Sequence, residues 1–421
     1  MSIALRVLIF GAIIFLIDLY FYQAISTILK GTSPAKRLYA FYIYWGFTAF
    51  TFILFLTTTV LGFAGLPQFI RVYLVPLLVL IIISKLIGSV FLAVDDIIRL
   101  FRWIGTYIFK APVIETMEVV KNPHAISRLK FLNYIAVGMA ALPFASFIYG
   151  MVKGAFDYTI HNQKVVLPNL PSEFNGLKIV QISDIHSGSF VSTKHLEDAL
   201  KIVMKQNADI IFFTGDLVNN RSDEAVPFID ILSTLKAPMG VYSILGNHDY
   251  GDYVTWESVE AKAKNLQDLK DIHAKAGWKL MLNEHVVLKK GDAEIALLGI
   301  ENWGGHLNFP KYGNMKKAYE GAEKYPVKLL LSHDPSHWSV QVIKDYKDID
   351  ITFSGHTHGF QFGIEIPGFK WSPSQYVYKQ WAGLYSENNQ HVYVNRGLGF
   401  LGYPGRVGIL PEITVMQLYN S

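Results

Sequence analysis

Five short polar clusters stand out in the C-terminal part of the chain. Each follows a run of apolar and β-branched residues that is typical of a buried strand. Carboxylate oxygens, amide oxygens and imidazole nitrogens are ligands of divalent metal ions, so this residue set predicts a metal centre. The clusters are Asp184-Ile185-His186, Gly215-Asp216, Gly246-Asn247-His248-Asp249, Ser332-His333-Asp334 and Gly355-His356-Thr357-His358.

The residue types in these clusters favour a particular kind of metal chemistry. In Asp184-x-His186 and His356-x-His358, the two outer side chains point the same way from an extended backbone. So many oxygen and nitrogen ligands suit two adjacent ions with a bridging carboxylate, which can activate a water for attack on a phosphoester. The chain contains no cysteine, which excludes thiolate sites, iron–sulfur clusters and disulfides.

Alternating strands and helices must position these clusters from residue 176 onward. The patterns predict helices over about 192–205, 255–275 and 336–345, which indicates an α/β or α+β domain. In open α/β sheets the ligands bind at the carboxyl ends of the strands, so we expect the clusters to meet at one rim. Strands are predicted over 177–183, 209–214, 240–245, 294–300, 327–332 and 349–354.

In this order and spacing, the clusters resemble the motifs of the calcineurin-like metallophosphoesterase superfamily. The similarity covers roughly residues 172–421, and the segment from Leu170 to His186 resembles the bacterial membrane-associated branch. The resemblance implies a four-layer α/β/β/α sandwich and hydrolysis of a phosphomonoester or phosphodiester. It also implies two divalent metal ions as cofactors, and the ligand types are compatible with Mn, Fe or Zn.

The resemblance also implies a role for each cluster residue. His248 would be a cation or proton donor at the phosphate, and Asp249 would orient it. Asp216 would bridge the two ions. The remaining ligands would be Asp184, His186 and His358 for one ion, and Asn247, His333 and His356 for the other.

Two arginines near the C-terminus are candidate phosphate contacts. Arg396 and Arg406 lie in glycine- and proline-rich segments that also match the membrane-associated branch. A guanidinium fork fits phosphate oxygens, which favours a substrate role. The alternative is that both arginines form structural ion pairs.

The first 153 residues have the composition of a membrane region. Four segments reach the length of about 20 apolar residues that a spanning helix needs, namely 5–27, 40–62, 72–94 and 131–152. Asp18 and Lys85 lie inside two of them and either pair with each other, extend separately to the membrane interface, or mark a function. Residues 95–110 predict an amphipathic helix, lying on the membrane surface or packed on the bundle. The predicted domains are therefore residues 1–153, the transmembrane region, and 154–421, the metallophosphoesterase domain.

The charge distribution predicts the orientation of the chain. Residues 1–153 carry 13 Lys and Arg against 5 Asp and Glu, whereas the remainder carries 25 against 29. An acidic C-terminal domain without a basic stripe argues against nucleic-acid binding. Nine Lys and Arg lie on one side of the four spans and three on the other. The nine mark the cytoplasmic side, so we expect a bacterial cell-membrane protein with an extracytoplasmic catalytic domain.

Two functions from different classes follow. The first is a membrane-anchored phosphoesterase, whose nearness to the bilayer favours a lipid-linked or envelope substrate. Some members of the family that the chain resembles hydrolyse the pyrophosphate of UDP-2,3-diacylglucosamine. The same activity in this chain would imply a cytoplasmic site, which conflicts with the predicted orientation. The alternative is a membrane sensor or transporter whose outer domain binds metal or phosphate without turnover.

Overall fold

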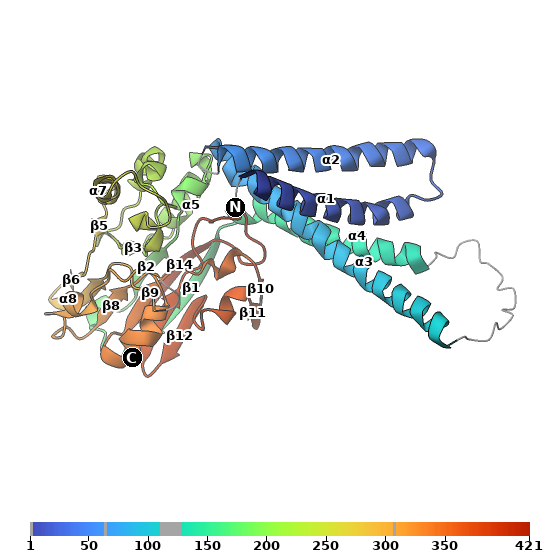
Figure 1. The fold of residues 1–421 in the computed structure, drawn as a ribbon. Coiled ribbons are helices and arrows are strands. Elements are labelled where there is room, and N and C mark those ends of the chain that lie inside the picture. Colours follow the sequence, from blue (N-terminus) through green and yellow to red (C-terminus); the bar gives the residue numbers. More distant parts are fainter. Residues whose placement is uncertain (1–2, 63–64, 110–127, 306–308) are drawn as a thin grey trace. The chain divides into compact units, whose positions relative to one another are not determined.

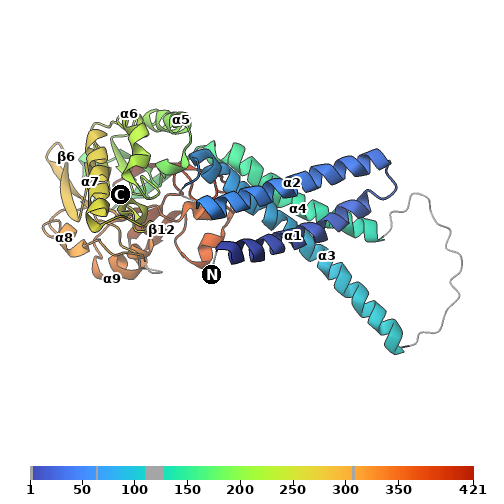
Figure 2. The same ribbon diagram turned by 45° about the horizontal axis from the view of Figure 1, so that its top comes forward.

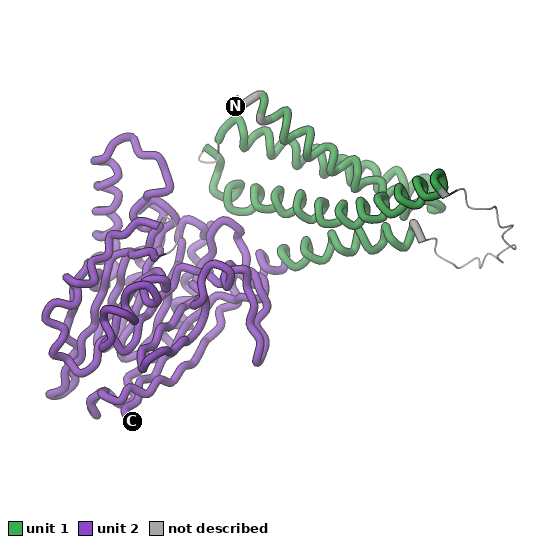
Figure 3. The backbone as a smooth tube through the Cα atoms, turned by 60° about the horizontal axis from the view of Figure 1, so that its bottom comes forward, with its two compact units in different colours: residues 1–148 green, residues 149–421 purple. Residues whose placement is uncertain are grey.

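The chain forms two compact units, residues 1–148 and 149–421 (Figure 3). The computed structural model describes residues 3–62, 65–109, 128–305 and 309–421. The division between the units falls after Ile148, so the last turn of the helix Arg128–Val152 belongs to the second unit. This turn therefore connects the membrane region to the folded domain without a linker.

The first unit consists of long apolar helices: α1 (Ile3–Ile28), α2 (Pro34–Leu61), a short π-helix η1 (Ile70–Leu74), α3 (Val75–Phe109) and α4 (Arg128–Val152). Four stretches are long and apolar enough to cross a membrane, at Val7–Ile28, Pro34–Leu61, Ile70–Ile108 and Lys130–Phe156. The helices expose large apolar side chains such as Leu8, Ile43 and Ile53, which is expected where lipid is the solvent. The predicted four-helix transmembrane region is confirmed.

The third helix is longer than predicted. α3 runs without a break through residues 95–109, where the sequence predicts a separate amphipathic helix; Lys110 lies outside the described residues. Arg99 pairs with Asp95, one turn earlier, at 3.2 Å and also with Asp96. Such pairs support a continuing helix, and neither glycine nor proline interrupts the chain near residue 95. The predicted surface helix is therefore the last part of α3.

The two ionisable residues inside the spans pair with each other. Lys85 Nζ donates to Asp18 Oδ1, and the side chains of Lys85 and Asp18 are 12% and 2% exposed. Tyr44 completes the cluster, because its hydroxyl donates to the backbone oxygen of Asp18 at 2.9 Å and its ring lies 4.7 Å from Lys85 Nζ. The pairing alternative is confirmed.

Removing one partner of this pair should destabilise the first unit. Lys85→Met leaves Asp18 as an uncompensated carboxylate among apolar helices, which should cost about 2 kcal/mol. Asp18→Asn combined with Lys85→Met removes both charges and should restore most of the loss. Melting of the full-length protein in detergent measures both effects, and a double variant less stable than the single one would contradict a structural role for the pair.

The second unit contains two six-stranded sheets (Figure 1). The first has the order β1-β14-β2-β3-β4-β5 and the second the order β12-β13-β9-β8-β7-β6. The first sheet is formed by β1 (Thr159–Val166), β2 (Leu177–Ile182), β3 (Ile210–Phe213), β4 (Val241–Ser243), β5 (Lys279–Leu280) and β14 (Glu412–Tyr419). The second is formed by β6 (Glu284–Lys290), β7 (Ala293–Gly299), β8 (Lys328–Leu331), β9 (Ile351–Ser354), β12 (Gly383–Glu387) and β13 (Gln390–Val394). A separate hairpin joins β10 (Ile364–Ile366) to β11 (Phe369–Trp371).

The two sheets pack face to face and helices cover their outer faces (Figure 2). In β7, Ile295 and Leu297 belong to the core between the sheets, whereas Ala296 and Leu298 pack with the outer helices. This confirms the four-layer α/β/β/α sandwich. The covering helices are α5 (Thr193–Met204), α6 (Ile229–Leu232) and α7 (Val259–Lys275) on the first sheet, and α8 (Met315–Tyr319) and α9 (Ile343–Asp345) on the second.

The strand directions decide where the polar clusters lie. β2, β3 and β4 are mutually parallel in one sheet, and β7, β8 and β9 are mutually parallel in the other. The carboxyl ends of parallel strands meet at one edge of a sheet. Each sheet therefore delivers the residues that follow its central strands to a single rim.

Candidate metal centre

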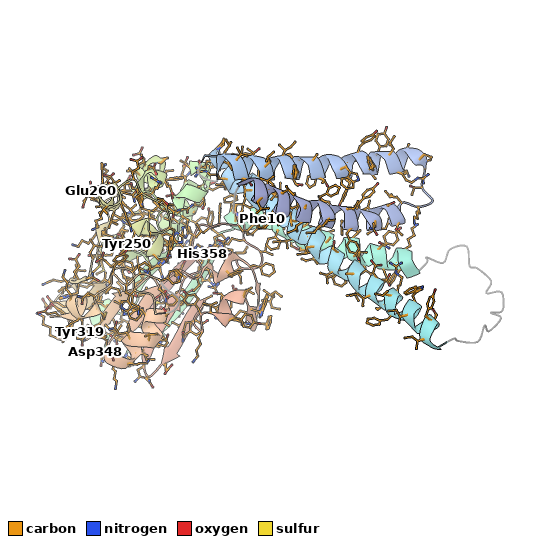
Figure 4. All side chains as sticks on the ribbon, in the orientation of Figure 1. Phe10, Tyr250, Glu260, Tyr319, Asp348 and His358 are labelled. Atoms are coloured by element: carbon orange, nitrogen blue, oxygen red, sulfur yellow. The ribbon has the colours of Figure 1, made fainter. Side chains whose placement is uncertain are left out.

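The predicted ligands converge from both sheets. Asp184 and His186 follow β2, and Asp216 follows β3. Asn247 and His248 begin the 3₁₀ turn η6 (Asn247–Tyr250) after β4. His333 follows β8, and His356 and His358, the latter labelled in Figure 4, follow β9.

Asp184, His186 and His358 form one potential metal-binding group. Their ligand atoms all lie within 4.8 Å of one another, and all three residues are buried. His358 Nε2 lies 3.3 Å from Asp184 Oδ1 and 3.0 Å from His186 Nε2. These three side chains therefore surround one point that a cation could occupy.

Asp216, His333 and His356 form a second such group. His333 Nε2 lies 3.2 Å from Asp216 Oδ2, and Asn247 Oδ1 lies 2.7 Å from His356 Nδ1. The same Asp216 oxygen is 3.6 Å from His186 Nε2 in the first group. The Asp216 carboxylate therefore lies between the two groups, where a bridging ligand would have to be.

The electrostatics of the cluster fit divalent cations. Burial raises the pKa of Asp184 to about 6 and lowers the pKa of His186 to about 3. Burial alone would lower the pKa of His333, but Asp216 outweighs it and raises that pKa to about 10. Among the described atoms, His186 Nδ1 is buried without a hydrogen-bond partner, whereas His333 Nε2 faces Asp216 Oδ2 at 3.2 Å. Burying carboxylates and an unpaired imidazole nitrogen together costs free energy. Positive ions bound between these groups would offset that cost.

The backbone is strained at the same residues. Among the described residues, eleven other than glycine have positive φ, and five of them are Asp184, His186, Asp216, His356 and His358. Such strain concentrates at functional sites, where the surrounding structure must hold it. The neighbouring glycines leave room for the carboxylates, since a Cβ on Gly355 would come within 2.2 Å of Asp184 Oδ2 and one on Gly246 within 2.2 Å of Asp216 Oδ1.

A backbone carbonyl orients His248, and Asp249 has another role. The Nδ1 atom of His248 lies 2.7 Å from the backbone oxygen of Asn219, an acceptor that requires the proton on Nδ1. The Asp249 carboxylate instead accepts backbone N–H bonds from Asp216, Leu217, Val218 and Gly246 at 2.9–3.2 Å. Asp249 therefore fixes the loop that carries Asp216 and does not orient His248, which corrects the sequence-based expectation.

The two predicted phosphate contacts have internal partners. Arg396 is bound to Glu412 and, at 2.5 Å, to Glu365, and its side chain is 3% exposed. Arg406 is buried and donates to backbone oxygens, including those of His358 at 3.1 Å and Arg396 at 2.7 Å. A phosphate could reach either guanidinium only after these bonds were broken, so the geometry argues against the predicted substrate role.

Several contacts around the ligands were not predicted. Tyr378 OH lies 2.7 Å from His356 Nε2, and the backbone oxygen of Thr214 lies 2.7 Å from His333 Nδ1. The Asp334 carboxylate is 3.7 Å from His356 Nε2. Asp334 was visible beside His333 in the sequence, whereas a carbonyl oxygen leaves no sequence signal. Contacts of this kind fix the orientation and tautomer of ligand imidazoles.

Comparison with known protein families agrees with this geometry. The profile described as "Probable Calcineurin-like phosphoesterase, transmembrane domain" matches residues 3–155. The profile described as "Calcineurin-like phosphoesterase" matches residues 177–360, which contain all seven predicted metal ligands. The two matches cover the membrane region and the sheet domain separately.

Individual relatives carry related names. The Danio rerio "Transmembrane protein with metallophosphoesterase domain" is 30% identical over 65% of this chain, and the match spans only 60% of that protein's length. The metallophosphoesterase YkuE of Bacillus subtilis is 31% identical over 60% of this chain and 82% of its own. The "UDP-2,3-diacylglucosamine pyrophosphatase LpxG" of Chlamydia trachomatis is 27% identical over 55% of this chain and 81% of its own.

Proposed function

Because the chain belongs to the calcineurin-like metallophosphoesterase family, we propose that it is a membrane-anchored hydrolase that uses two divalent metal ions to cleave a phosphoester. The observation that carries this proposal is the position of Asp216 Oδ2, 3.2 Å from His333 Nε2 and 3.6 Å from His186 Nε2. Asp184, His186 and His358 would hold one ion, Asn247, His333 and His356 the other, and Asp216 both. Mn, Fe and Zn all suit this ligand set.

Bound metal ions would supply a nucleophilic water and neutralise the charge that gathers on the phosphoryl oxygens. His248 supplies the remaining catalytic group. With the proton of Nδ1 directed at Asn219, the Nε2 atom of a protonated His248 is available to donate to the leaving oxygen. Its backbone N–H also donates to Asp216 Oδ1 at 2.9 Å, which ties the position of the donor to the metal-bridging carboxylate.

The substrate that we propose is a lipid-linked or envelope phosphoester. Two observations support it: the domain follows a membrane span directly, and one relative carries the name of a pyrophosphatase for a diacylated sugar nucleotide. That nucleotide itself would imply a cytoplasmic site, so the relative supports a lipid-linked substrate class and not the same substrate. We also propose that the catalytic domain lies outside the cytoplasm of a bacterial cell, because nine Lys and Arg flank the spans on one side and three on the other. Of the nine, Lys110 and Lys121 lie outside the described residues.

The proposal is tested with full-length protein purified in detergent. The protein is stripped with a chelator, reloaded with Mn²⁺, Fe²⁺ or Zn²⁺, and assayed with p-nitrophenyl phosphate, bis-p-nitrophenyl phosphate and a lipid-linked pyrophosphate. We expect hydrolysis of at least one substrate only after metal is restored. A protein that binds two metal ions per chain but hydrolyses none of these three substrates would contradict the proposal. It would favour the sensor or transporter alternative.

A further inference from the structure

The hairpin that follows His358 exposes an unusual number of apolar side chains. Phe360, Ile364, Ile366, Phe369, Tyr376 and Val377, which we call the hairpin patch, are between 49% and 76% exposed. Contiguous exposed apolar surface on a folded domain marks a binding surface for protein, ligand or membrane. The exposure of the hairpin patch therefore indicates a candidate binding surface.

The hairpin carries its apolar side chains on one face and its charged side chains on the other. Ile364 pairs with Trp371 and Ile366 with Phe369, so these four side chains share one face. The opposite face carries Glu365 and Lys370, of which Glu365 binds Arg396 and Lys370 Nζ donates to the backbone oxygen of Ala382 at 2.5 Å. In a sheet exposed to water the apolar face normally packs on the core. This hairpin has the reverse arrangement and is held in place by its polar face.

The patch begins at the metal centre, through strained backbone. The four residues from His358 to Gln361 all have positive φ, between 51° and 57°. Such values are rare for a bulky residue, yet Phe360 adopts them while 64% of its surface is exposed. The strained backbone at Phe360 is not compensated by burial of its ring. This favours a functional role for the exposed ring.

The patch also begins beside the end of a candidate membrane span. The fourth span reaches Phe156, and its residue Gly150 accepts a backbone hydrogen bond from Arg406 at 3.1 Å. The next residue, Val407, exchanges backbone hydrogen bonds with Gln361 and Gly363 at 2.9 Å, immediately before β10. A short chain of backbone contacts within the second unit thus connects the membrane-side helix end to the start of the hairpin.

The surroundings of the patch have the composition of a membrane interface. A hollow of about 740 Å³ is lined by the exposed side chains of Tyr376, Val377 and Lys379. Its wall also includes Tyr385, the buried Trp381, and Lys370, which donates to the backbone oxygen of Ala382. Tyr and Trp are enriched where membrane meets water, and Lys residues there attract anionic headgroups. Aromatic, aliphatic and basic side chains occur here together.

We propose that the hairpin patch inserts into the headgroup region of the bilayer and thereby docks the catalytic domain on the membrane surface. The occupant of the patch is anionic phospholipid. The patch side chains would lie about 5–10 Å deep, at the boundary between headgroups and acyl chains. The domain would then have two attachments to the membrane, the fourth span and the hairpin.

Docking at this point would place the metal centre at the lipid surface. Tyr378, next to the patch residue Val377, contacts the predicted ligand His356 through its hydroxyl. The headgroup of a lipid-linked phosphoester would reach the metal centre while its acyl chains stayed in the bilayer. This consequence for the substrate rests on the proposed function, whereas the docking itself does not.

Spin labelling of the full-length chain tests the proposal, and the absence of cysteine makes each label unique. Ile366→Cys and Phe369→Cys place nitroxides on the patch. The control is Val259→Cys, an apolar residue of the same unit that begins α7 and is 80% exposed. The labelled proteins are reconstituted in nanodiscs of phosphatidylcholine and phosphatidylglycerol. Collisions are then measured with oxygen, which concentrates in the bilayer, and with a nickel chelate, which stays in water.

We expect oxygen to relax the labels at 366 and 369 more strongly than the nickel chelate does, and the order to be reversed at 259. Labels at 366 and 369 that meet the chelate as often as the control would overturn the proposal. Labels shielded from both reagents would also overturn it, because they would show that a protein surface covers the patch. The measurement needs neither metal nor turnover, so its failure is distinguishable from failure of the proposed hydrolase activity.

Discussion

The Asp216→Asn variant should hydrolyse phosphoesters at least about a thousandfold more slowly than the wild-type protein, a loss of about 4 kcal/mol in transition-state stabilisation. The Asp216 carboxylate lies between the two groups of ligands, and its backbone accepts from His186 at 3.1 Å. An amide is nearly isosteric with the carboxylate but lacks the charge and the second oxygen ligand. We therefore expect reduced metal content together with reduced kcat.

Rates and metal content are compared in the purified full-length protein. The matched control is Asp230→Asn, which makes the same change at an exposed position on α6 and should leave both quantities unchanged. Metal analysis separates loss of metal from loss of chemistry. Activity within tenfold of wild type in Asp216→Asn, at full metal loading, would show that Asp216 does not bridge the ions.

The Arg396→Ala variant should destabilise the catalytic domain by about 3–5 kcal/mol. The Arg396 guanidinium and the Glu412 carboxylate are 3% and 0% exposed, so the substitution leaves a buried charge without its partner. The other Glu412 oxygen accepts from Tyr393 at 2.5 Å and Thr414 at 2.6 Å, which holds the carboxylate in place. The Glu412 carboxylate therefore cannot move into water in the variant, and the loss of stability is not reduced by such a movement.

The pH dependence of this contribution follows from Glu412. Burial alone would raise the pKa of Glu412, but Arg396 outweighs it and lowers the pKa to about 2. Because the folded pKa is depressed, the ion pair stabilises the fold fully above the ordinary glutamate pKa of about 4.3. The contribution is lost as the pH falls from there through about 2. Arg396→Ala should lack this acid-dependent loss.

Thermal melting of the detergent-solubilised protein from about pH 2 to about pH 7, a range that encloses this window, measures these effects. Arg221→Ala is the control, because Arg221 is an exposed arginine whose contact is the Trp256 ring, 4.4 Å away. It should cost no more than about 1 kcal/mol. Equal destabilisation by the two substitutions would contradict the structural role of Arg396 and reopen its predicted contact with phosphate.

Local sequence patterns were sufficient to locate the clusters of predicted ligands. Apolar runs such as 177–182 became buried strands, and each polar cluster follows the strand that was predicted to precede it. The helix after Ser192 also formed as expected, with the Ser192 hydroxyl accepting from the backbone of Lys194. The alternation of side chains along a strand and the position where a strand ends depend on neighbouring residues. Both can therefore be predicted from one sequence.

The misassigned features depend on contacts that are distant in the sequence. β1 pairs in parallel with β14, more than 200 residues later, and no local pattern predicts that register. A guanidinium suits phosphate and carboxylate equally, and only the folded positions of Glu365 and Glu412 decide the partner of Arg396. His248 is oriented by a backbone oxygen, which every residue possesses. Sequence reasoning therefore found the residues that converge in the fold more completely than the groups that orient them.

The exposure of the hairpin patch also depends on a contact between residues that are distant in the sequence. Ile364, Ile366 and Phe369 have the composition of an ordinary buried hairpin, and the sequence gives no reason to expect their exposure. Their outward orientation follows from the ion pair between Glu365 and Arg396 on the opposite face. The ion pair between Glu365 and Arg396 thus accounts for which face of the hairpin is exposed.

The central claim is that seven side chains hold two metal ions in one site. Anomalous scattering from crystals of the full-length protein loaded with Mn²⁺ tests it most directly. We expect two peaks, one at Asp184, His186 and His358, the other at Asn247, His333 and His356, with Asp216 touching both. A single peak, or peaks elsewhere with these residues unliganded, would contradict it.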